Sequence, residues 1–220
     1  MPDGNKKEKE KMIVQKMVFS DVFAANCYFY TDEKSKHGFV IDPSAHAEKL
    51  LEHIEKNNLV IEKILLTHSH LDHIGAASML SKALGVDVFG MKTAAEYLEN
   101  PDLSGHFSDR EVLRNLKHIN DGDEIVLSVN PNIRLKVFAT PGHTIDSAVY
   151  FDKREQIAFT GDTIFESSVG RTDIPGSGGD EKMLLCSIIG KVLSLPENTI
   201  LYPGHGESTT VGREKAFFFD

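Results

Sequence analysis

Hydrophobic and polar positions along the chain predict an ordered series of strands and helices. The first apolar segments, rich in Val, Ile, Phe and Tyr, have the composition of strands and predict an antiparallel meander over residues 12–20, 27–31 and 37–42. The sequence Asp42-Pro43-Ser44 then indicates a stop, and Ser44 is expected to cap a helix over residues 45–56. That helix would bury an apolar stripe of Leu50, Leu51 and Ile54.

The same reading extends through the rest of the chain. A short buried strand over 63–66 runs into a polar stretch, and a helix from 75 or 76 to 84, a strand over 86–89 and a helix over 93–98 follow. Residues 101–120 have weak periodicity and predict a surface excursion with one helical turn. Strands are then expected over 124–129, 134–139, 148–151, 157–160 and 199–202. A flexible Gly/Ser loop over 176–179 precedes an amphipathic helix over 181–193, with Met183, Leu184, Ile188 and Val192 as its apolar residues.

The amino-acid composition limits the classes of protein to which the chain can belong. The chain has 220 residues, of which 40% are hydrophobic and 26% charged, enough apolar material for a sizeable core. No linker divides it, so a single domain over 12–220 is expected after a polar tail over 1–11. The net charge of −9 (24 basic minus 33 acidic residues) argues against nucleic acid or an anionic membrane as a partner. Cys27 and Cys186 form no Cys-x-x-Cys pair, and neither a signal peptide nor a membrane span is recognisable, which predicts a cytoplasmic location.

The chain contains ten histidines, and the positions of several of them indicate a functional site. His68, His70, Asp72 and His73 fall immediately after the expected strand over 63–66. Strand alternation would separate His73 from the others, whereas a tight turn at the end of a strand can bring the four side chains together. Imidazole and carboxylate ligands suit zinc, iron or manganese. The alternative, a solvated polar loop, usually draws on Gly, Asn and Ser rather than on three imidazoles.

Three further ligand-type residues have the same setting of strand, glycine and polar side chain. They are His143 after Pro141-Gly142, Asp162 after Gly161, and His205 after Pro203-Gly204. Each one alone is explained equally well as a turn residue, a cap or a hydrogen-bonded structural residue. Together with the first cluster they supply a set of nitrogen and oxygen ligands at the ends of strands, where functional groups are commonly mounted.

The ordered motifs Thr-His-Ser-His-Leu-Asp-His (67–73), Pro-Gly-His-Thr (141–144), Gly-Asp-Thr (161–163) and Gly-His-Gly (204–206) resemble those of the metallo-β-lactamase superfamily. Within it, the chain is similar to the small glyoxalase II-like (hydroxyacylglutathione hydrolase-like) hydrolases, over residues 14–215. The resemblance implies an α/β fold, a four-layer αββα sandwich with a dinuclear metal site at one edge. It also implies that His68, His70 and His143 hold one metal, that Asp72, His73 and His205 hold a second, and that Asp162 bridges them.

The same resemblance implies a mechanism. Two zinc ions, or iron or manganese at one or both sites, would acidify a shared water, and the resulting hydroxide would attack the carbonyl of a small thioester substrate. Asp72 and Asp162 are then the carboxylates expected to take part in catalysis. A thiolate leaving group needs little protonation, so no separate general acid is required. Hydroxyls of Thr67, Thr144 and Thr163 are candidates for fixing the imidazole tautomers.

The match departs from glyoxalase II in one functional segment. Gly170-Arg171-Thr172-Asp173 stands where glyoxalase II has a Gly-Lys-Phe-Tyr-like run that contacts glutathione, and 220 − 205 = 15 residues follow His205, with no helical extension. Arg171 can bind a substrate carboxylate, and its alternative is an ion pair with Asp173. A different acyl thioester is therefore an open alternative to lactoylglutathione.

Other functions stay open. Gly-Arg-Thr-Asp also resembles persulfide dioxygenases, which would hold one iron with His68 or its pair, His143 and Asp162. A lactone or ester hydrolase uses the same chemistry, and a metal-storing protein without activity is the non-enzymatic alternative. The remaining histidines are expected to be surface or structural residues, with His106 and Phe107 as a hypothetical lid over the substrate. They are His37, His46, His53, His106 and His118.

Overall fold

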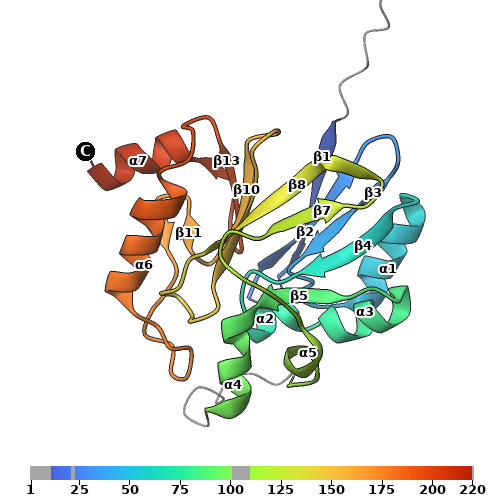
Figure 1. Ribbon diagram of the computed structural model, residues 1–220, viewed down its shortest axis with the longest axis horizontal. Helices are drawn as coiled ribbons and strands as arrows, with labels where there is room; N and C mark the ends of the chain where they lie inside the picture. Colours follow the sequence, from blue (N-terminus) through green and yellow to red (C-terminus); the bar gives the residue numbers. More distant parts are fainter. Residues whose placement is uncertain (1–10, 21–22, 101–109, 220) are drawn as a thin grey trace, which may run out of the picture.

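Two six-stranded mixed sheets face each other at the centre of the molecule, and helices cover their outer faces (Figure 1). The computed structural model describes residues 11–20, 23–100 and 110–219 of the chain. The αββα sandwich expected from the sequence is confirmed. The expected polar tail over 1–11 lies outside the described residues except for Lys11, and so do His106 and Phe107 of the hypothetical lid.

The first sheet begins with the predicted antiparallel meander and continues with parallel strands. Its order is β1 (Met12–Phe19), β2 (Ala25–Asp32), β3 (His37–Ile41), β4 (Val60–Leu65), β5 (Val88–Met91) and β6 (Lys117–Ile119). The strand β2 is buried along its whole length because side chains alternate between two apolar layers. Cys27 and Phe29 pack in the cluster that includes the helices, whereas Tyr28 and Tyr30 pack between the two sheets.

The second sheet supplies the other half of the sandwich. Its order is β14 (Thr209–Thr210), β13 (Ile200–Pro203), β10 (Ile157–Gly161), β9 (Ala148–Asp152), β8 (Asn130–Ala139) and β7 (Glu124–Leu127). A separate small hairpin consists of β11 (Ile164–Phe165) and β12 (Ser168–Val169). Side chains from both large sheets, such as Phe39 and Leu65 from the first and Leu135 and Phe159 from the second, form the central core.

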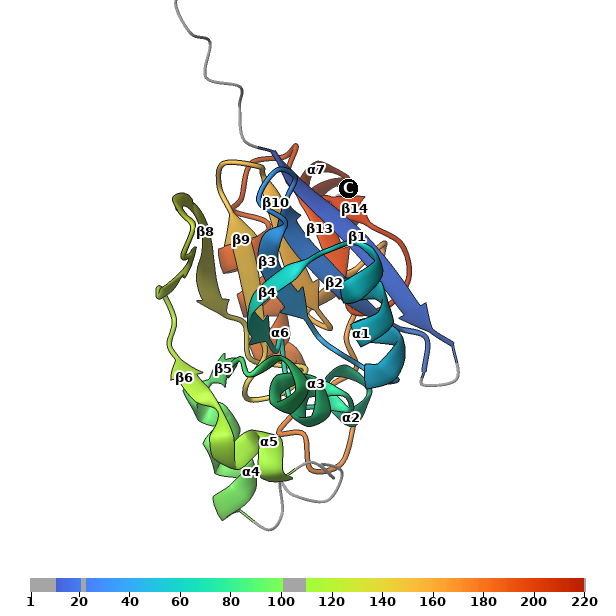
Figure 2. The same cartoon turned by 90° about the vertical axis from the view of Figure 1, so that its right-hand side faces the viewer.

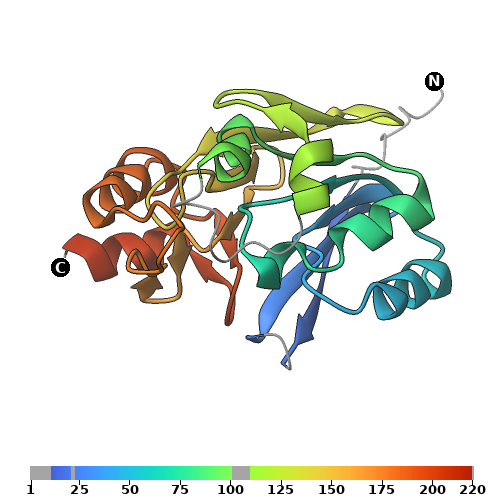
Figure 3. The same ribbon diagram turned by 90° about the horizontal axis from the view of Figure 1, so that it is seen from below.

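Helices pack on both outer faces. The first sheet is covered by α1 (Ala47–Lys56) and α3 (Ala77–Leu84), and the second by α6 (Glu181–Ser187), the following π-helix η3 (Ile188–Val192) and α7 (Val211–Phe219). Figures 2 and 3 show the α1/α3 pair and the α6/α7 pair on opposite sides of the sheets. Short helical segments complete the first half: α2 (Leu71–Ile74), η1 (Lys92–Ala95), α4 (Glu96–Glu99) and α5 (Arg110–Asn115). Among the described helices, none is long and apolar enough to span a membrane.

Strand direction determines where the site can form. The strands β3 and β4 are parallel, so their carboxyl ends lie at one edge of the first sheet. In the second sheet β8 and β10 are each antiparallel to β9, and β13 is parallel to β10, so these three strands also end at a common edge. The two edges meet, since the Ala148 N–H donates to Thr67 O at 2.8 Å and the Tyr150 hydroxyl donates to Leu66 O at 2.5 Å.

Two predicted helix details are wrong. The helix α1 begins at Ala47, and its N-cap residue is His46 in a left-handed conformation (φ 53°) with no side-chain cap bond, so Ser44 is not the cap. Ser44 is instead buried against Gly75, where an added Cβ would lie 2.5 Å from Ser44 O. At the other end of the chain, the predicted helix over 181–193 becomes a π-helix after Ser187, and Met183 is exposed rather than part of the apolar stripe.

The predicted surface excursion over 101–120 contains buried residues and a strand that the sequence did not predict. Within its described part, Val112 and Leu113 of α5 are buried, and residues 117–119 form the edge strand β6, which pairs with β5. A three-residue strand is too short for its periodicity to be recognised in sequence. The elements α2, β11, β12, β14 and α7 were also not anticipated. The triple-Phe segment belongs to α7, where Phe218 packs against the third apolar cluster while Phe217 and Phe219 are exposed.

Candidate metal centre

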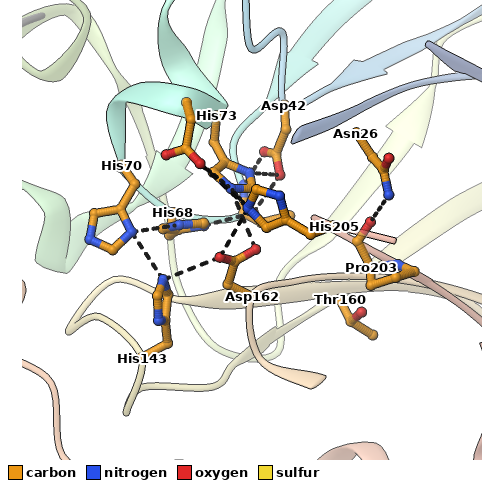
Figure 4. Close-up of polar contacts among 12 residues, drawn as sticks. Asn26, Asp42, His68, His70, His73, His143, Thr160, Asp162, Pro203 and His205 are labelled. Carbon is orange, nitrogen blue, oxygen red and sulfur yellow. Dashed lines mark hydrogen bonds and ion pairs between the residues drawn. The ribbon is translucent and has the colours of Figure 1, made fainter. Parts of the chain in front are cut away.

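All seven ligand-type residues predicted from the sequence lie together where the two sheet edges meet (Figure 4). Four follow β4: His68 and His70 lie in the connection to α2, and Asp72 and His73 lie in the single turn of α2. The other three follow the ends of β8, β10 and β13 and come from the second sheet. They are His143, Asp162 and His205. The tight turn expected after the strand is therefore the short helix α2, whose N-cap residue is His70.

The first group of three imidazoles is tightly convergent. His70 Nδ1 lies 3.1 Å from His68 Nε2 and 3.0 Å from His143 Nε2. All three side chains are buried, with exposed fractions between 1 and 8%. Three ring nitrogens facing one point, in a place with little solvent, form the donor set that a first-row transition metal prefers.

The second group combines two imidazoles with a carboxylate. His73 Nε2 lies 3.4 Å from His205 Nε2, and Asp72 Oδ2 lies 3.4 Å from His205 Nε2 and 3.7 Å from His73 Nε2. The ligand atoms of each group lie within 4.8 Å of one another. In the described residues, His37, His46, His53 and His118 belong to neither group.

Asp162 lies between the two groups and contacts both. Its Oδ2 atom is 3.5 Å from His143 Nε2 of the first group and 3.4 Å from His205 Nε2 of the second, and its Oδ1 atom is 3.4 Å from His73 Nε2. Oδ1 is buried and has no hydrogen-bond partner among the described residues. A buried carboxylate oxygen without a donor is costly, and a cation between the two groups would satisfy it. The residues present therefore fit a metal centre.

The electrostatics of the two groups differ. Burial, and after it the neighbouring imidazoles, holds the pKa of His68 well below its usual value and lowers the pKa of His70 to about 3. Burial opposes protonation of His73 and His205 too, but Asp162 and the other nearby carboxylates raise the pKa to about 9 and about 10, respectively. The first group is therefore neutral near pH 7, as metal ligands must be. In the second group the carboxylates favour positive charge, which a metal cation would supply in place of protons.

Asp42 is a functional residue that the sequence reading missed. It directly follows β3, and its Oδ2 atom lies 3.0 Å from His73 Nδ1, which leaves Nε2 of that ring facing the second group. The same carboxylate accepts hydrogen bonds from the Thr67 backbone N–H at 2.7 Å and the Thr67 hydroxyl at 2.6 Å. Asp42 resembles Asp162 in sequence, since each is an acidic residue at the end of a buried strand, but the Pro43 that follows Asp42 is typical of a simple turn.

Contacts from outside the two ligand groups also orient the imidazole rings of His68 and His143. The Thr67 hydroxyl lies 3.1 Å from His68 Nδ1, as proposed for a tautomer-fixing threonine. His143 Nδ1 is held by the backbone carbonyl of Arg171 at 2.5 Å, a role that no sequence motif indicated. The Thr144 hydroxyl lies 2.7 Å from Ser147 Oγ, and the Thr163 hydroxyl 2.8 Å from Thr140 Oγ1, so these two brace the neighbouring turns.

A buried network supports the turn between His68 and His70. Ser69 donates to Asp146 Oδ2 at 2.5 Å, and the Tyr97 hydroxyl, from α4, lies 3.1 Å from Asp146 Oδ1 and 2.9 Å from Ser177 O. Asp146 is buried, and burial raises the pKa of its carboxyl despite these donors. The network connects the first ligand-bearing turn to the loop that lines the pocket next to the site.

Two glycines allow the close packing around the centre. A Cβ added to Gly204 would lie 2.2 Å from Asp162 Oδ1 and 2.6 Å from His73 Cε1. A Cβ added to Gly170 would lie 1.9 Å from Asp162 O and 3.0 Å from His143 Cγ. A side chain at either position would displace groups of the candidate site, so the glycines are required by contact with it.

The site opens into a pocket of about 600 Å³. Its walls include His70, Asp72, His143, Asp162 and His205, and beyond them Phe23, Leu71, Arg171, Ile174 and Pro175. The exposed guanidinium of Arg171 forms a two-point ion pair with Asp173, Nε to Oδ1 at 2.8 Å and Nη2 to Oδ2 at 3.1 Å. The Arg171 side chain therefore forms the predicted alternative, an ion pair with Asp173, in a residue that also belongs to the pocket lining.

The arrangement is therefore a cluster of imidazoles and carboxylates on the floor of an accessible pocket. A closed structural zinc site surrounds its metal with four protein ligands, commonly cysteines, whereas here each group offers three and Asp162 is shared. Such a centre leaves coordination positions open to water and to a substrate.

Comparisons with known proteins agree with this geometry. Residues 20–205 match the model of the metallo-beta-lactamase superfamily. The hydroxyacylglutathione hydrolase GloC of Haemophilus influenzae is 35% identical over 197 residues, which cover 88% of this chain and 91% of the relative.

Solved structures give the same result. The BLEG-1 B3 metallo-beta-lactamase superposes with a TM-score of 0.79 at 32% identity, covering 93% of this chain and 97% of the other. The structure of TTHA1623 in a di-iron-bound form superposes with a TM-score of 0.77 at 30% identity, covering 92% and 97% of the two chains. The similarity therefore spans both sheets and every segment that carries a candidate ligand.

Proposed function

The chain belongs to the metallo-β-lactamase superfamily of metallo-hydrolases, and we propose that it hydrolyses a small acyl thioester of the hydroxyacylglutathione type. The observation that carries the proposal is Asp162, whose carboxylate lies within 3.5 Å of imidazoles from both ligand groups on the floor of an open pocket. The similarity to a hydroxyacylglutathione hydrolase supports the choice of a thioester.

We propose two metal ions, with zinc as the first candidate. His68, His70 and His143 would hold one ion, Asp72, His73 and His205 the other, and Asp162 would bridge them. The di-iron form of a similar structure supports iron as an alternative, and manganese suits the same ligands. When bound, the ions supply an acidified water and a Lewis acid for the carbonyl oxygen.

The residues of the chain hold and orient the reacting groups. Asp42 and the Arg171 carbonyl keep Nδ1 of His73 and His143 engaged, so that Nε2 of each ring faces the centre. In the reaction, water adds to the thioester carbonyl carbon and the C–S bond breaks, giving a carboxylic acid and a thiol. A thiolate is a good leaving group, so the absence of a general acid from the proposed machinery is consistent with this substrate.

Arg171 is the proposed substrate-binding residue. Arg171 is one of the residues that line the pocket, and an exposed ion pair such as that with Asp173 contributes little energy, so a substrate carboxylate can exchange with Asp173. We expect Arg171→Ala to raise KM for an anionic thioester and to leave KM for an uncharged thioester nearly unchanged. Equal effects on both substrates would remove Arg171 from this role.

We further propose that the protein acts in the cytoplasm on small molecules, without nucleic acid or membrane as partner. Its two cysteines are free, Cys27 buried and Cys186 exposed, as expected in a reducing compartment. The acidic net charge of −9 disfavours polyanionic partners.

The decisive experiment pairs elemental analysis with parallel assays of the purified protein. The protein loaded with Zn²⁺, Fe²⁺ or Mn²⁺ is offered S-lactoylglutathione, an uncharged acyl thioester, a lactone and a β-lactam, and oxygen uptake is measured with a persulfide. About two metal equivalents together with thioester hydrolysis support the proposal. About one iron with persulfide-dependent oxygen consumption would establish the dioxygenase instead, and hydrolysis of the lactone alone would establish a lactonase. Metal-loaded protein with no activity in any assay would favour a metal-storing protein.

A further inference from the structure

Beyond the candidate ligands, the pocket wall is largely apolar. Phe23, Leu71, Ile174 and Pro175, here called the apolar wall, line the pocket together with Arg171. Phe23 is 84% exposed and Leu71 is 44% exposed, although both are large hydrophobic side chains next to a polar centre. Large apolar side chains that remain exposed around a pocket commonly mark the place where a ligand covers them.

Phe23 is held at this place by the backbone around it. Phe23 and Ala24 have φ angles of 52° and 53°, and two consecutive non-glycine residues in the left-handed region are unusual and costly. Directly after them, Ala25 forms an isolated bridge with His205, and the Asn26 N–H donates to Gly204 O at 2.7 Å. The strained turn thus places the Phe23 ring beside the pocket and ties it to the segment that carries His205.

The Asn26 side chain strengthens this connection. Its Nδ2 atom donates to Pro203 O at 2.9 Å (Figure 4). It also donates to Gly206 O at 3.0 Å, on the other side of His205. Asn26 and its bond to Pro203 O are buried, so this bond is shielded from water. The start of β2 is therefore tied to the loop after β13, and Phe23 precedes this connection by two residues.

The other part of the wall is also anchored. Ile174 O accepts hydrogen bonds from the Ser177 hydroxyl at 2.8 Å and the Ser177 N–H at 3.2 Å, and Ser177 O in turn accepts from the Tyr97 hydroxyl. Ser177 is fully buried. An anchored apolar surface can discriminate between ligands because it does not collapse when it is empty.

We propose that the apolar wall binds an uncharged apolar group that the substrate carries next to its scissile carbonyl, with Phe23 as the main specificity-determining residue. This inference rests on the proposed thioester hydrolysis and names the substrate class for the same site. Among the thioesters that the site accepts, those that carry a longer apolar chain are preferred over those with a shorter one. The Arg171–Asp173 pair stands beside this wall and governs a separate property, the preference for a charged end of the substrate.

The test uses uncharged thioesters of N-acetylcysteamine with acetyl, butanoyl and hexanoyl groups, hydrolysed by the metal-loaded protein. Each methylene that leaves water for the wall should raise kcat/KM by roughly fourfold. A second series keeps the acyl group as acetyl and lengthens the alkyl chain of the thiol. A rise in only one series identifies which half of the substrate contacts the wall, whereas flat responses in both series would overturn the proposal.

Variants locate the effect. Phe23→Ala should flatten the chain-length response, lowering kcat/KM for the best long-chain substrate roughly tenfold more than for the acetyl compound, while metal content stays unchanged. Phe23→Leu should restore most of the response. The matched control is Phe217→Ala, which removes another exposed phenylalanine, on α7 and outside the pocket lining, and should change nothing. A Phe23→Ala protein with the wild-type response would overturn the assignment.

A binding measurement separates this inference from the proposed function. S-methyl and S-hexyl thioethers of N-acetylcysteamine cannot be hydrolysed, and calorimetry should show tighter binding of the hexyl compound to the wild type but not to Phe23→Ala. If no thioester is hydrolysed while this difference is present, thioester hydrolysis is refuted and the wall is supported. If thioesters are hydrolysed but the two thioethers bind equally and neither chain-length series responds, the wall is refuted and the proposed function stands.

Discussion

Replacing Gly204 with alanine should damage metal binding far more than folding. Gly204 lies outside the left-handed region, so alanine can adopt its backbone conformation. The added Cβ would, however, lie 2.2 Å from Asp162 Oδ1 and 2.6 Å from His73 Cε1, whereas real Cβ atoms essentially never approach heavy atoms closer than 3.0 Å. Because the nearest atom is the end of a side chain, the conflict can be relieved by moving Asp162 away from its place between the two ligand groups.

The two consequences differ in size. An extra methyl group in a packed region typically costs about 1–3 kcal/mol, and movement of the Asp162 carboxylate should keep the loss of unfolding free energy at the lower end of that range. Disturbance of groups that orient metal ligands typically costs about 10- to 100-fold in metal affinity, equivalent to about 1.4–2.7 kcal/mol. Gly204→Ala would move Asp162, which is itself a proposed ligand, so an affinity loss of at least this size is expected.

The assay measures zinc affinity by competition with a chromophoric chelator and stability by urea unfolding of the metal-free protein. The control is Gly190→Ala, because Gly190 has a negative φ and an added Cβ there has no neighbour within 4 Å. This control should bind zinc as the wild type does, with unchanged or slightly raised stability because alanine favours a helix. Unchanged zinc affinity and stoichiometry in Gly204→Ala would refute the placement of Asp162 as a shared ligand.

Further predictions concern the centre and its support. Asp162→Ala should lower metal content at both sites and reduce kcat by more than about 100-fold, by elemental analysis and steady-state kinetics, and full activity would contradict the bridging role. In the metal-free protein the pKa of His73 is about 9 and that of His205 about 10, so both are protonated at pH 7 and metal binding should release protons. Affinity should then fall as pH falls, by up to about 100-fold per pH unit for two displaced protons, and a calorimetric heat that is independent of the buffer would exclude this linkage. Tyr97→Phe removes a donor from a buried carboxylate and should lower the unfolding free energy by about 1–3 kcal/mol, in contrast to Tyr202→Phe, whose hydroxyl is outside that network. Equal stability of these two variants in urea would remove the network from any role in folding.

The seven ligand-type residues were readable from sequence because each is an unusual residue type at the end of a recognisable strand. The order of strands also followed from apolar patterning, since segments such as β2 and β10 are buried over their whole length. The local sequence did not predict the role of a residue where that role depends on a contact with a distant part of the chain. Asp42 has the sequence appearance of a turn residue before proline, and only the arrival of His73 from α2 gives its carboxylate a role.

Other structural features could not be predicted from the sequence because they also depend on distant residues or on backbone atoms. Phe23 has a left-handed conformation two residues before Ala25, which forms a bridge with His205, a residue 180 positions away (205 − 25). The backbone carbonyl of Arg171 contacts His143 Nδ1, and because every residue type has a backbone carbonyl, the sequence cannot reveal this contact. Helix α7 is not predicted by the sequence because its aromatic residues do not form an apolar stripe. Phe217 and Phe219 are exposed, and only Phe218 packs against the core.

The origin of the ligands in both sheets has a consequence for how the molecule unfolds. His68 and His205 are separated by 205 − 68 = 137 positions in the chain, and ions held between the two sheets would act as a cross-link that closes this loop. Closing a loop of that length removes conformational freedom from the unfolded chain, an effect that for disulfides of about 100 residues is worth about 4–5 kcal/mol. A chelator should therefore act as a selective denaturant, lowering the melting temperature by an amount that depends on the concentration of free metal.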